Sequence, residues 1–121
     1  NPYYQNVLLD IYDFFEEGIK KIDNKKIIID AGIGFGKNLK HNLTLISNIS
    51  LFHSLGFPLL IGTSRKRFIN QISGKYDSND RTGGTIASVL FLLSQGVQIF
   101  RVHNVSEVKQ GILVFEKLMR N

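Results

Sequence analysis

Three short apolar runs, each followed by polar residues and separated by helical patterns, constrain most strongly what this chain can fold into. The runs, rich in Ile, Leu and Val, cover residues 27–29, 59–62 and 97–102. Their length is typical of strands in a parallel sheet, and the unbroken Ile run suggests burial on both faces. Alternating strands and helices predict a parallel sheet with right-handed crossovers. We therefore predict an α/β fold in which a leading helix precedes three consecutive βα units.

Apolar residues at helical spacing predict four helices between and around these strands. The first covers residues 7–19, the second starts near Asn42, the third includes residues 86–93 and the last begins at Ser106. Asn42 and Ser106 are the expected N-caps, since their side chains can accept a bond from the first turn. The third helix is apolar on nearly all sides, which predicts that it packs on two faces. No change in composition divides the chain, so residues 1–121 are expected to form part of one domain.

Composition excludes several classes of protein. With 43% hydrophobic and 21% charged residues among 121, the chain can form a core and is not disordered. It has no cysteine, which excludes disulfides and cysteine zinc sites and fits a reducing compartment. No apolar run approaches ~18 residues and no signal sequence is recognisable, so we expect a cytoplasmic protein without a membrane partner. The net charge of +5 is dispersed, and no nucleic acid partner is predicted.

Polar side chains follow each predicted strand where it ends. Asp30 follows the first strand, residues 64–66 (Ser-Arg-Lys) follow the second, and Arg101 and His103 close the third. The carboxyl ends of parallel strands share one edge of a sheet, where α/β proteins place their ligands. Each residue alone could be a solvated charge or a structural histidine. Together they predict a site containing a carboxylate, cations, a hydroxyl and an imidazole.

The loop after the first strand is rich in glycine but fits neither common phosphate-binding motif. A P-loop would need glycine at Ala31 and serine or threonine at Asn38, and the dinucleotide fingerprint would need a third glycine at Lys37. The loop could instead let Phe35 project over a small flat ligand beside Asp30. The alternative is that Asp30 only accepts hydrogen bonds from the turn itself.

Four motifs together resemble one family. Residues 30–37 (Asp-Ala-Gly-Ile-Gly-Phe-Gly-Lys), 41–43 (His-Asn-Leu), 62–66 (Gly-Thr-Ser-Arg-Lys) and 101–105 (Arg-Val-His-Asn-Val) have the order and spacing seen in dihydropteroate synthase. The whole chain resembles the carboxyl-terminal part of that enzyme. Two departures are Ala31, where the family usually has Pro, and Asn104, where it usually has Asp beside the histidine.

The resemblance implies a fold and a reaction. The family fold is a (β/α)₈ barrel of ~250 residues, which would make these strands the sixth, seventh and eighth and leave about half the barrel absent. The implied reaction joins p-aminobenzoate to (7,8-dihydropterin-6-yl)methyl diphosphate, releasing diphosphate, in folate biosynthesis. It is assisted by Mg²⁺, whose ligand residue is expected in the missing amino-terminal half. A homodimer through the last helices is also implied.

The resemblance further implies roles for six residues. Asp30, Lys66 and Arg101 would bind the pterin, Phe35 and Ser64 the p-aminobenzoate, and Arg101 and His103 the diphosphate. Lys66, Arg101 and His103 would then be the catalytic residues. Two alternatives stay open: a non-catalytic pterin- or phosphate-binding fragment or partner subunit, and an unrelated doubly wound phosphate-binding domain. We expect that the 121 residues alone do not catalyse the reaction, since half the site would be absent.

Overall fold

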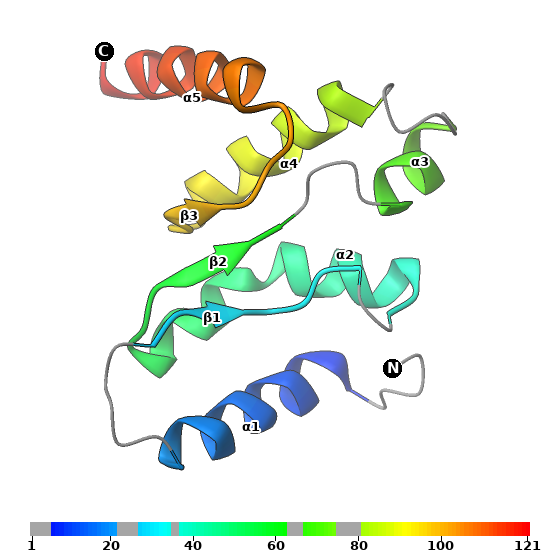
Figure 1. Cartoon of the computed structure of the whole chain (residues 1–121), viewed down its shortest axis with the longest axis vertical. Coiled ribbons are helices and arrows are strands. Elements are labelled where there is room, and N and C mark those ends of the chain that lie inside the picture. The colour runs from blue at the N-terminus through cyan, green and yellow to red at the C-terminus, as the bar shows by residue number, and fades with distance from the viewer. Residues whose placement is uncertain (1–5, 22–26, 35–36, 63–66, 75–80) are drawn as a thin grey trace.

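The computed structural model describes residues 6–21, 27–34, 37–62, 67–74 and 81–121, and it confirms the predicted α/β organisation (Figure 1). Three parallel strands form a sheet in the order β1-β2-β3, with Ile29 paired to Leu59 and Leu60 to Ile99. The elements in chain order are α1 (Val7–Lys20), β1 (Ile29–Asp30), α2 (Leu39–Ser47), the 3₁₀ helix η1 (Ile49–Leu55), β2 (Leu59–Ile61), α3 (Arg67–Ser73), α4 (Thr82–Ser94), β3 (Ile99–Phe100) and α5 (Val105–Arg120).

The sheet is covered on one face. In Figure 1, α2 and α4 lie behind the strands, and the described elements leave the face toward the viewer open. Leu59 and Ile61 point to the covered face and are buried, whereas Ile28 is 58% exposed. The prediction that the Ile run is buried on both faces is therefore wrong for the described chain. Successive strand residues point to opposite faces, and only one face has helices packed on it.

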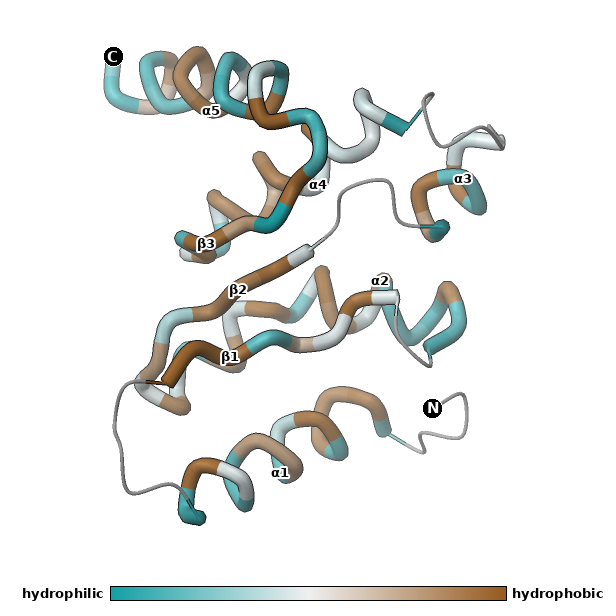
Figure 2. Tube along the Cα trace, viewed as in Figure 1, coloured by the Kyte–Doolittle hydropathy of each residue, from teal (hydrophilic) through white to brown (hydrophobic). Residues whose placement is uncertain are grey.

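The core lies between the covered face of the sheet and the helices. Phe52 of η1 is fully buried at its centre, and the ring of Phe15 from α1 meets it edge-on with ring centroids 5.9 Å apart. Tyr12, one turn earlier, also packs against Phe52. Figure 2 shows that β1 and β3 each change from hydrophobic to hydrophilic at the carboxyl end. The apolar stripe of α1 thus holds this helix on the same core as the sheet.

Both predicted N-caps are wrong. Helix α2 begins one turn earlier than expected, because Asn38 accepts a hydrogen bond from the His41 N–H at 2.8 Å, and Asn42 is buried inside the helix. Helix α5 has Asn104 as its N-cap residue, without a side-chain capping bond, and Ser106 lies in its first turn. The second helical segment ends at η1, because Gly56 follows it in a left-handed conformation.

Helix α3 has no counterpart among the predicted elements, because seven residues are too few to show a clear period. Helix α4 packs on two faces, as predicted: Val89 and Leu92 are fully buried, while Ile86 and Leu90 line a groove shared with α5. No helix in the described part of the chain is long and apolar enough to cross a membrane.

Candidate active site at the carboxyl ends of the strands

Asp30 ends β1 and holds the turn that follows it. Its Oδ1 accepts a hydrogen bond from the Gly32 N–H at 2.9 Å. Gly32 has φ of +69°, a left-handed conformation that favours glycine. The alternative in which Asp30 bonds to its own turn is therefore correct for one carboxylate oxygen. The second oxygen, Oδ2, points away from this bond and is available to another group.

Arg101 reaches that second oxygen from β3, which lies on the other side of β2 from β1. It follows β3 directly, and its backbone N–H donates to the Ile61 carbonyl of β2 at 3.1 Å. Its Nη2 lies 3.5 Å from Asp30 Oδ2, although the two residues are 71 positions apart. The guanidinium passes over Gly62, where a Cβ would lie 3.0 Å from Nη2. The first and third strand ends therefore meet, as predicted, because Gly62, the residue that follows the central strand, has no side chain.

The pair between Asp30 and Arg101 is loose and partly open to solvent. The side chains are 38% and 59% exposed, and 3.5 Å is long for a charge-assisted hydrogen bond. Exposed pairs of this kind contribute about 0–1 kcal/mol to stability. A carboxylate offers about four lone-pair positions and a guanidinium five N–H donors. Most of this capacity is unused by the pair itself, so both groups can bind a ligand.

Two further side chains anchor the glycine loop, and sequence reasoning gave neither this role. Lys37 Nζ donates to the Gly32 carbonyl at 2.9 Å, and Asn42 Oδ1 accepts from the Gly34 N–H at 2.8 Å. Burial lowers the pKa of Lys37, and the negative charge of Asp30 partly opposes this shift. Lys37 belongs to the first of the four recognised motifs and Asn42 to the second, but only the folded loop brings their side chains back onto its glycines.

The remaining predicted site residues are described in part. Phe35, Ser64 and Lys66 lie outside the described residues. His103 is exposed in the connection between β3 and α5. Its neighbour Asn104 has a buried side-chain Oδ1 that accepts no hydrogen bond from the described residues. Of the predicted site residues, the structure thus brings together Asp30 and Arg101.

A hollow of about 320 Å³ opens beside this edge, between α1 and the end of β1. Asp30, Gly32 and Lys37 line one side, and Asp10 and Phe14 of α1 line the other. No group of three or more His, Cys, Asp or Glu side chains within the described ranges could hold a metal ion. The chemistry that these residues offer is recognition by a carboxylate and by cations.

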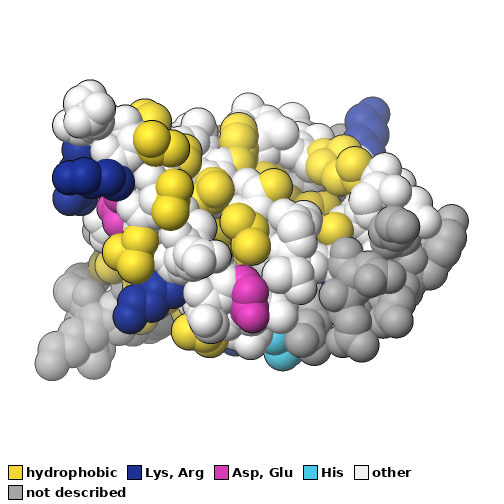
Figure 3. Space-filling model, turned by 90° about the horizontal axis from the view of Figure 1, so that it is seen from above, with side chains coloured by type: hydrophobic (Ala, Val, Ile, Leu, Met, Phe, Trp, Pro, Cys, Tyr) yellow, Lys and Arg dark blue, Asp and Glu magenta, His cyan; other side chains and the backbone are white. Residues whose placement is uncertain are grey.

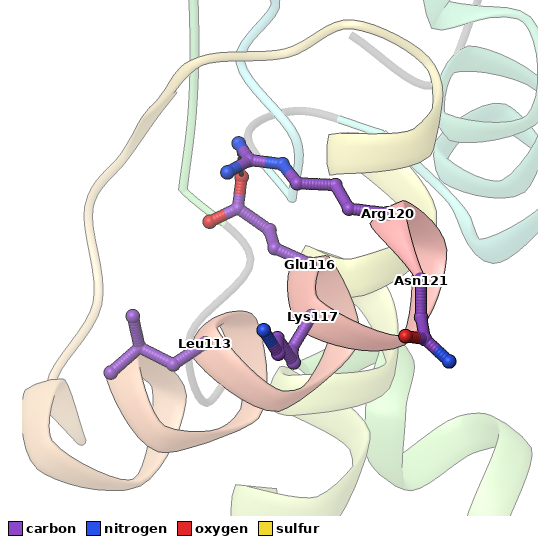
Figure 4. Close-up of a pocket in the computed structure, with 5 residues that line it drawn as sticks. All are labelled: Leu113, Glu116, Lys117, Arg120 and Asn121. Carbon is purple, nitrogen blue, oxygen red and sulfur yellow. Dashed lines mark hydrogen bonds and ion pairs between the residues drawn. The ribbon is translucent and has the colours of Figure 1, made fainter.

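A second hollow, of about 270 Å³, lies on the last turns of α5 (Figure 4). All of its lining residues come from this one helix and its end, and Glu116 and Arg120 form an ion pair across it at 3.4 Å. Figure 4 shows these two side chains directed toward each other. Residues of one helix surface cannot enclose a substrate, so the strand edge remains the candidate active site.

Comparison with known proteins gives a consistent result. The family described as "Pterin binding enzyme" matches residues 1–103. Dihydropteroate synthase of Escherichia coli (strain K12) is 37% identical over 120 residues, which cover 95% of this chain and 42% of that protein. The structure of the Yersinia pestis enzyme superposes with a TM-score of 0.92 at 35% identity, covering 99% of this chain and 51% of that one.

Dihydropteroate synthase from Thermus thermophilus in complex with 4-aminobenzoate also matches. Its TM-score is 0.91 at 35% identity, and the match covers 97% of this chain and 47% of that one. The chain therefore spans about half the length of the relatives it matches. On the family match and these identities, the chain belongs to the pterin-binding enzymes, among which its relatives are dihydropteroate synthases.

Proposed function

We propose that this chain is the carboxyl-terminal portion of a dihydropteroate synthase, which joins p-aminobenzoate to (7,8-dihydropterin-6-yl)methyl diphosphate in folate biosynthesis. The observation that carries the proposal is the meeting of Asp30 and Arg101 over Gly62 at the carboxyl edge of a parallel sheet. It places a carboxylate and a guanidinium, both able to bind more partners, at the position where such sheets bind ligands.

In the proposed reaction, Asp30 recognises the pterin. Its carboxylate accepts hydrogen bonds from the pterin 2-amino group and ring N–H, and Oδ2 has free acceptor positions for them. The Arg101 guanidinium is planar, so it can lie over the pterin ring and also donate to the diphosphate. Lys66 donates to the pterin carbonyl, and Phe35 and Ser64 bind the p-aminobenzoate. The Thermus thermophilus enzyme is known in complexes with 4-aminobenzoate and with 6HMPPP, which supports these substrate classes.

The chemical step needs no covalent nucleophile from the protein. The p-aminobenzoate nitrogen bonds to the methylene carbon of the pterin while the carbon–oxygen bond to diphosphate breaks, and the electron pair leaves with diphosphate. The amine then loses a proton to solvent. Arg101 and His103 stabilise the negative charge that develops on the leaving group, which is the main electrostatic demand of this displacement.

We place residues 1–121 in one (β/α)₈ barrel domain, as strands six to eight with their helices. The open face of the sheet and its two outer strands fit a sheet that continues in both directions. Mg²⁺ would neutralise charge on the diphosphate. The described residues include no group of three or more His, Cys, Asp or Glu side chains that could hold a metal ion, and we assign the magnesium ligand to a part of the enzyme outside this chain.

The surface of α4 and α5 supports a homodimer of this cytoplasmic enzyme through its last helices. Figure 3 shows hydrophobic side chains gathered on this face, and Leu113, Val114 and Leu118 of α5 are exposed. Exposed apolar patches of this kind mark interfaces. In the full-length protein, Leu118→Lys should shift the mass measured by light scattering from dimer to monomer, while Lys109→Glu on the exposed surface of α5 should not. If the Leu118→Lys variant were still dimeric, this surface would not be the dimer interface.

Asp30→Asn tests the proposed activity in the full-length protein. One amide cannot present two acceptors to two donors, so kcat/KM for the pterin substrate should fall by about 100-fold, the size expected for loss of a charged hydrogen-bonding partner. Asp13→Asn, which changes an exposed carboxylate on α1, is the matched control and should retain full activity. Absence of turnover by the unmodified protein, or full activity of Asp30→Asn, would overturn the proposal.

The open face of the sheet favours a second possibility for the isolated 121 residues, a fragment that binds phosphate or pterin without catalysis. Assays with both substrates and Mg²⁺ separate the two. The isolated chain should show no turnover, and adding the rest of the enzyme as a separate polypeptide should restore it. Turnover by the chain alone would show that its own residues complete the site.

A further inference from the structure

Lys37 and Asp30 are both bound to the backbone of Gly32. The Gly32 N–H donates to Asp30 Oδ1 at 2.9 Å, and the Gly32 carbonyl accepts from Lys37 Nζ at 2.9 Å. Nζ lies so close to this residue that a Cβ on Gly32 would be 3.2 Å away from it. A glycine in a left-handed conformation is thus fixed from both sides, by the carboxylate before it and by the ammonium after the loop.

The position of Lys37 carries an energetic cost that needs a compensating role. Its side chain is half-buried, and removal from water disfavours the ammonium and lowers its pKa. The groups that offset this cost are the Gly32 carbonyl and the carboxylate of Asp30, while Asp10 lines the opposite wall of the same hollow. An exposed lysine would avoid the cost, so the buried position indicates that the loop depends on this charge.

Arg101 pulls the same carboxylate in the opposite direction. It approaches Asp30 Oδ2 from β3 but stops at 3.5 Å, longer than a charge-assisted hydrogen bond. If the Asp30 carboxylate turned toward the guanidinium, the two would form a closer, bidentate pair and leave fewer acceptor positions for a ligand. Something must therefore hold Asp30 toward the turn that follows its strand. The bond from the Gly32 N–H does so, and Lys37 holds the carbonyl of the same glycine, in the next peptide unit.

We propose that Lys37 is a positioning residue that keeps the Asp30 carboxylate from closing onto Arg101 and so leaves it open to the pterin. This inference rests on the proposed function, since the ligand of Asp30 is the pterin. It adds a residue to the site that does not touch the substrate. Lys37 acts through the backbone of Gly32, by holding its carbonyl while its N–H donates to Asp30, and the loss of Lys37 lets Asp30 close onto Arg101.

The test uses the full-length protein and steady-state kinetics with each substrate varied. Lys37→Met should raise KM for the pterin substrate about tenfold, a coupling typical of side chains in one hydrogen-bonded network, and leave KM for p-aminobenzoate unchanged. Lys40→Met, which removes an exposed lysine three residues away on α2, is the matched control and should change neither. Lys37→Arg, which keeps the charge and the donor, should recover most of the affinity.

A double-mutant cycle distinguishes positioning of Asp30 from general support of the loop. In an Asp30→Asn background the carboxylate that Lys37 orients is gone, so adding Lys37→Met should change kcat/KM less than about twofold. An equal loss in both backgrounds, or equal rises in KM for the two substrates, would overturn the inference. If Lys37→Met does not fold, Lys37→Gln carries the same cycle. Inactivity of the unmodified protein would instead contradict the proposed function, which keeps the two failures distinct.

Discussion

At both edges of the sheet a glycine allows a side chain to lie over the backbone, but the two contacts have different roles. At the carboxyl edge, Gly62 has no side chain and Arg101 lies over it. At the amino edge, Gly96 has no side chain and the ring of His53 lies over it, 2.7 Å from where a Cβ would be. His53 then closes the edge by a hydrogen bond between its Nε2 and the Gln95 carbonyl at 2.8 Å. Arg101 instead reaches a carboxylate at 3.5 Å, and both charges stay partly exposed.

This difference separates stability from binding. At the amino edge an imidazole ring contacts backbone. Glycine is required there for two reasons: Gly96 has φ of +90°, and a Cβ would collide with the His53 ring. Gly62 does not have a positive φ, and only the mobile end of Arg101 approaches it. The amino edge is therefore rigid and expected to support the fold, while the carboxyl edge is adjustable and expected to bind. The same division is general in barrel enzymes.

Gly96→Ala should disrupt the contact at the amino edge and have the largest effect of the changes predicted here, a loss of stability. A left-handed alanine costs about 1–2 kcal/mol, and displacement of His53 from its backbone acceptor adds about 1 kcal/mol. We expect the free energy of unfolding, measured by urea denaturation of the full-length protein, to fall by about 2–3 kcal/mol. The KM values of the folded enzyme should not change. A stable variant with altered KM would reverse the roles assigned to the two edges.

Gly62→Ala should have the opposite result at the carboxyl edge. The new methyl group pushes the Arg101 guanidinium off the end of β2, and the backbone bears no strain. We expect a kcat/KM about tenfold lower, as for loss of one placed charged donor, with a change in unfolding free energy of less than about 0.5 kcal/mol. Gly83→Ala, at an open position of α4 with nothing within 4 Å, is the control. A strongly destabilised but fully active Gly62→Ala protein would refute the division.

The general fold could be predicted from local patterns. Apolar runs ending in Asp30 and Arg101 gave both the strands and the meeting of the first and third strand ends, because parallel order follows from the alternation of elements. Boundaries were harder. Asn38 and Asn42 are the same residue type one turn apart, so sequence alone could not decide which caps α2 and which is buried. The seven residues of α3 are too few for a period to identify.

The site could be predicted less completely, because its details depend on contacts between distant segments. Arg101 lies over Gly62 because of the order of the strands and the length of the arginine side chain. No local motif encodes this contact. Lys37 stands in the recognised motif, yet its bond to Gly32 requires the loop to turn back on itself. Sequence reasoning therefore found the residues that we propose to face a ligand more readily than those that hold them in place.

The smallest expected effect is a pH dependence of the unfolding free energy, which arises from Lys37 at the carboxyl edge. Burial lowers the pKa of Lys37 below its ordinary value of 10.5, and Asp30 only partly opposes this. Between the lowered pKa and 10.5 the unfolded chain binds more protons than the folded one, so this group makes stability rise with pH. Below that window both states are protonated and the full penalty for the buried ammonium remains.

Lys37→Met removes this contribution, whereas all other titrating groups cancel when the two proteins are compared. The variant's unfolding free energy minus that of the unmodified protein should therefore decrease as pH rises toward about 10.5, and it should be constant at neutral pH. Urea denaturation of the two proteins at a series of pH values measures this difference. A difference that increases with pH would mean that the charge of Asp30 affects the pKa of Lys37 more than burial does. The carboxyl edge would then be held by a strong ion pair, and it would be more rigid than we infer from the comparison with the amino edge.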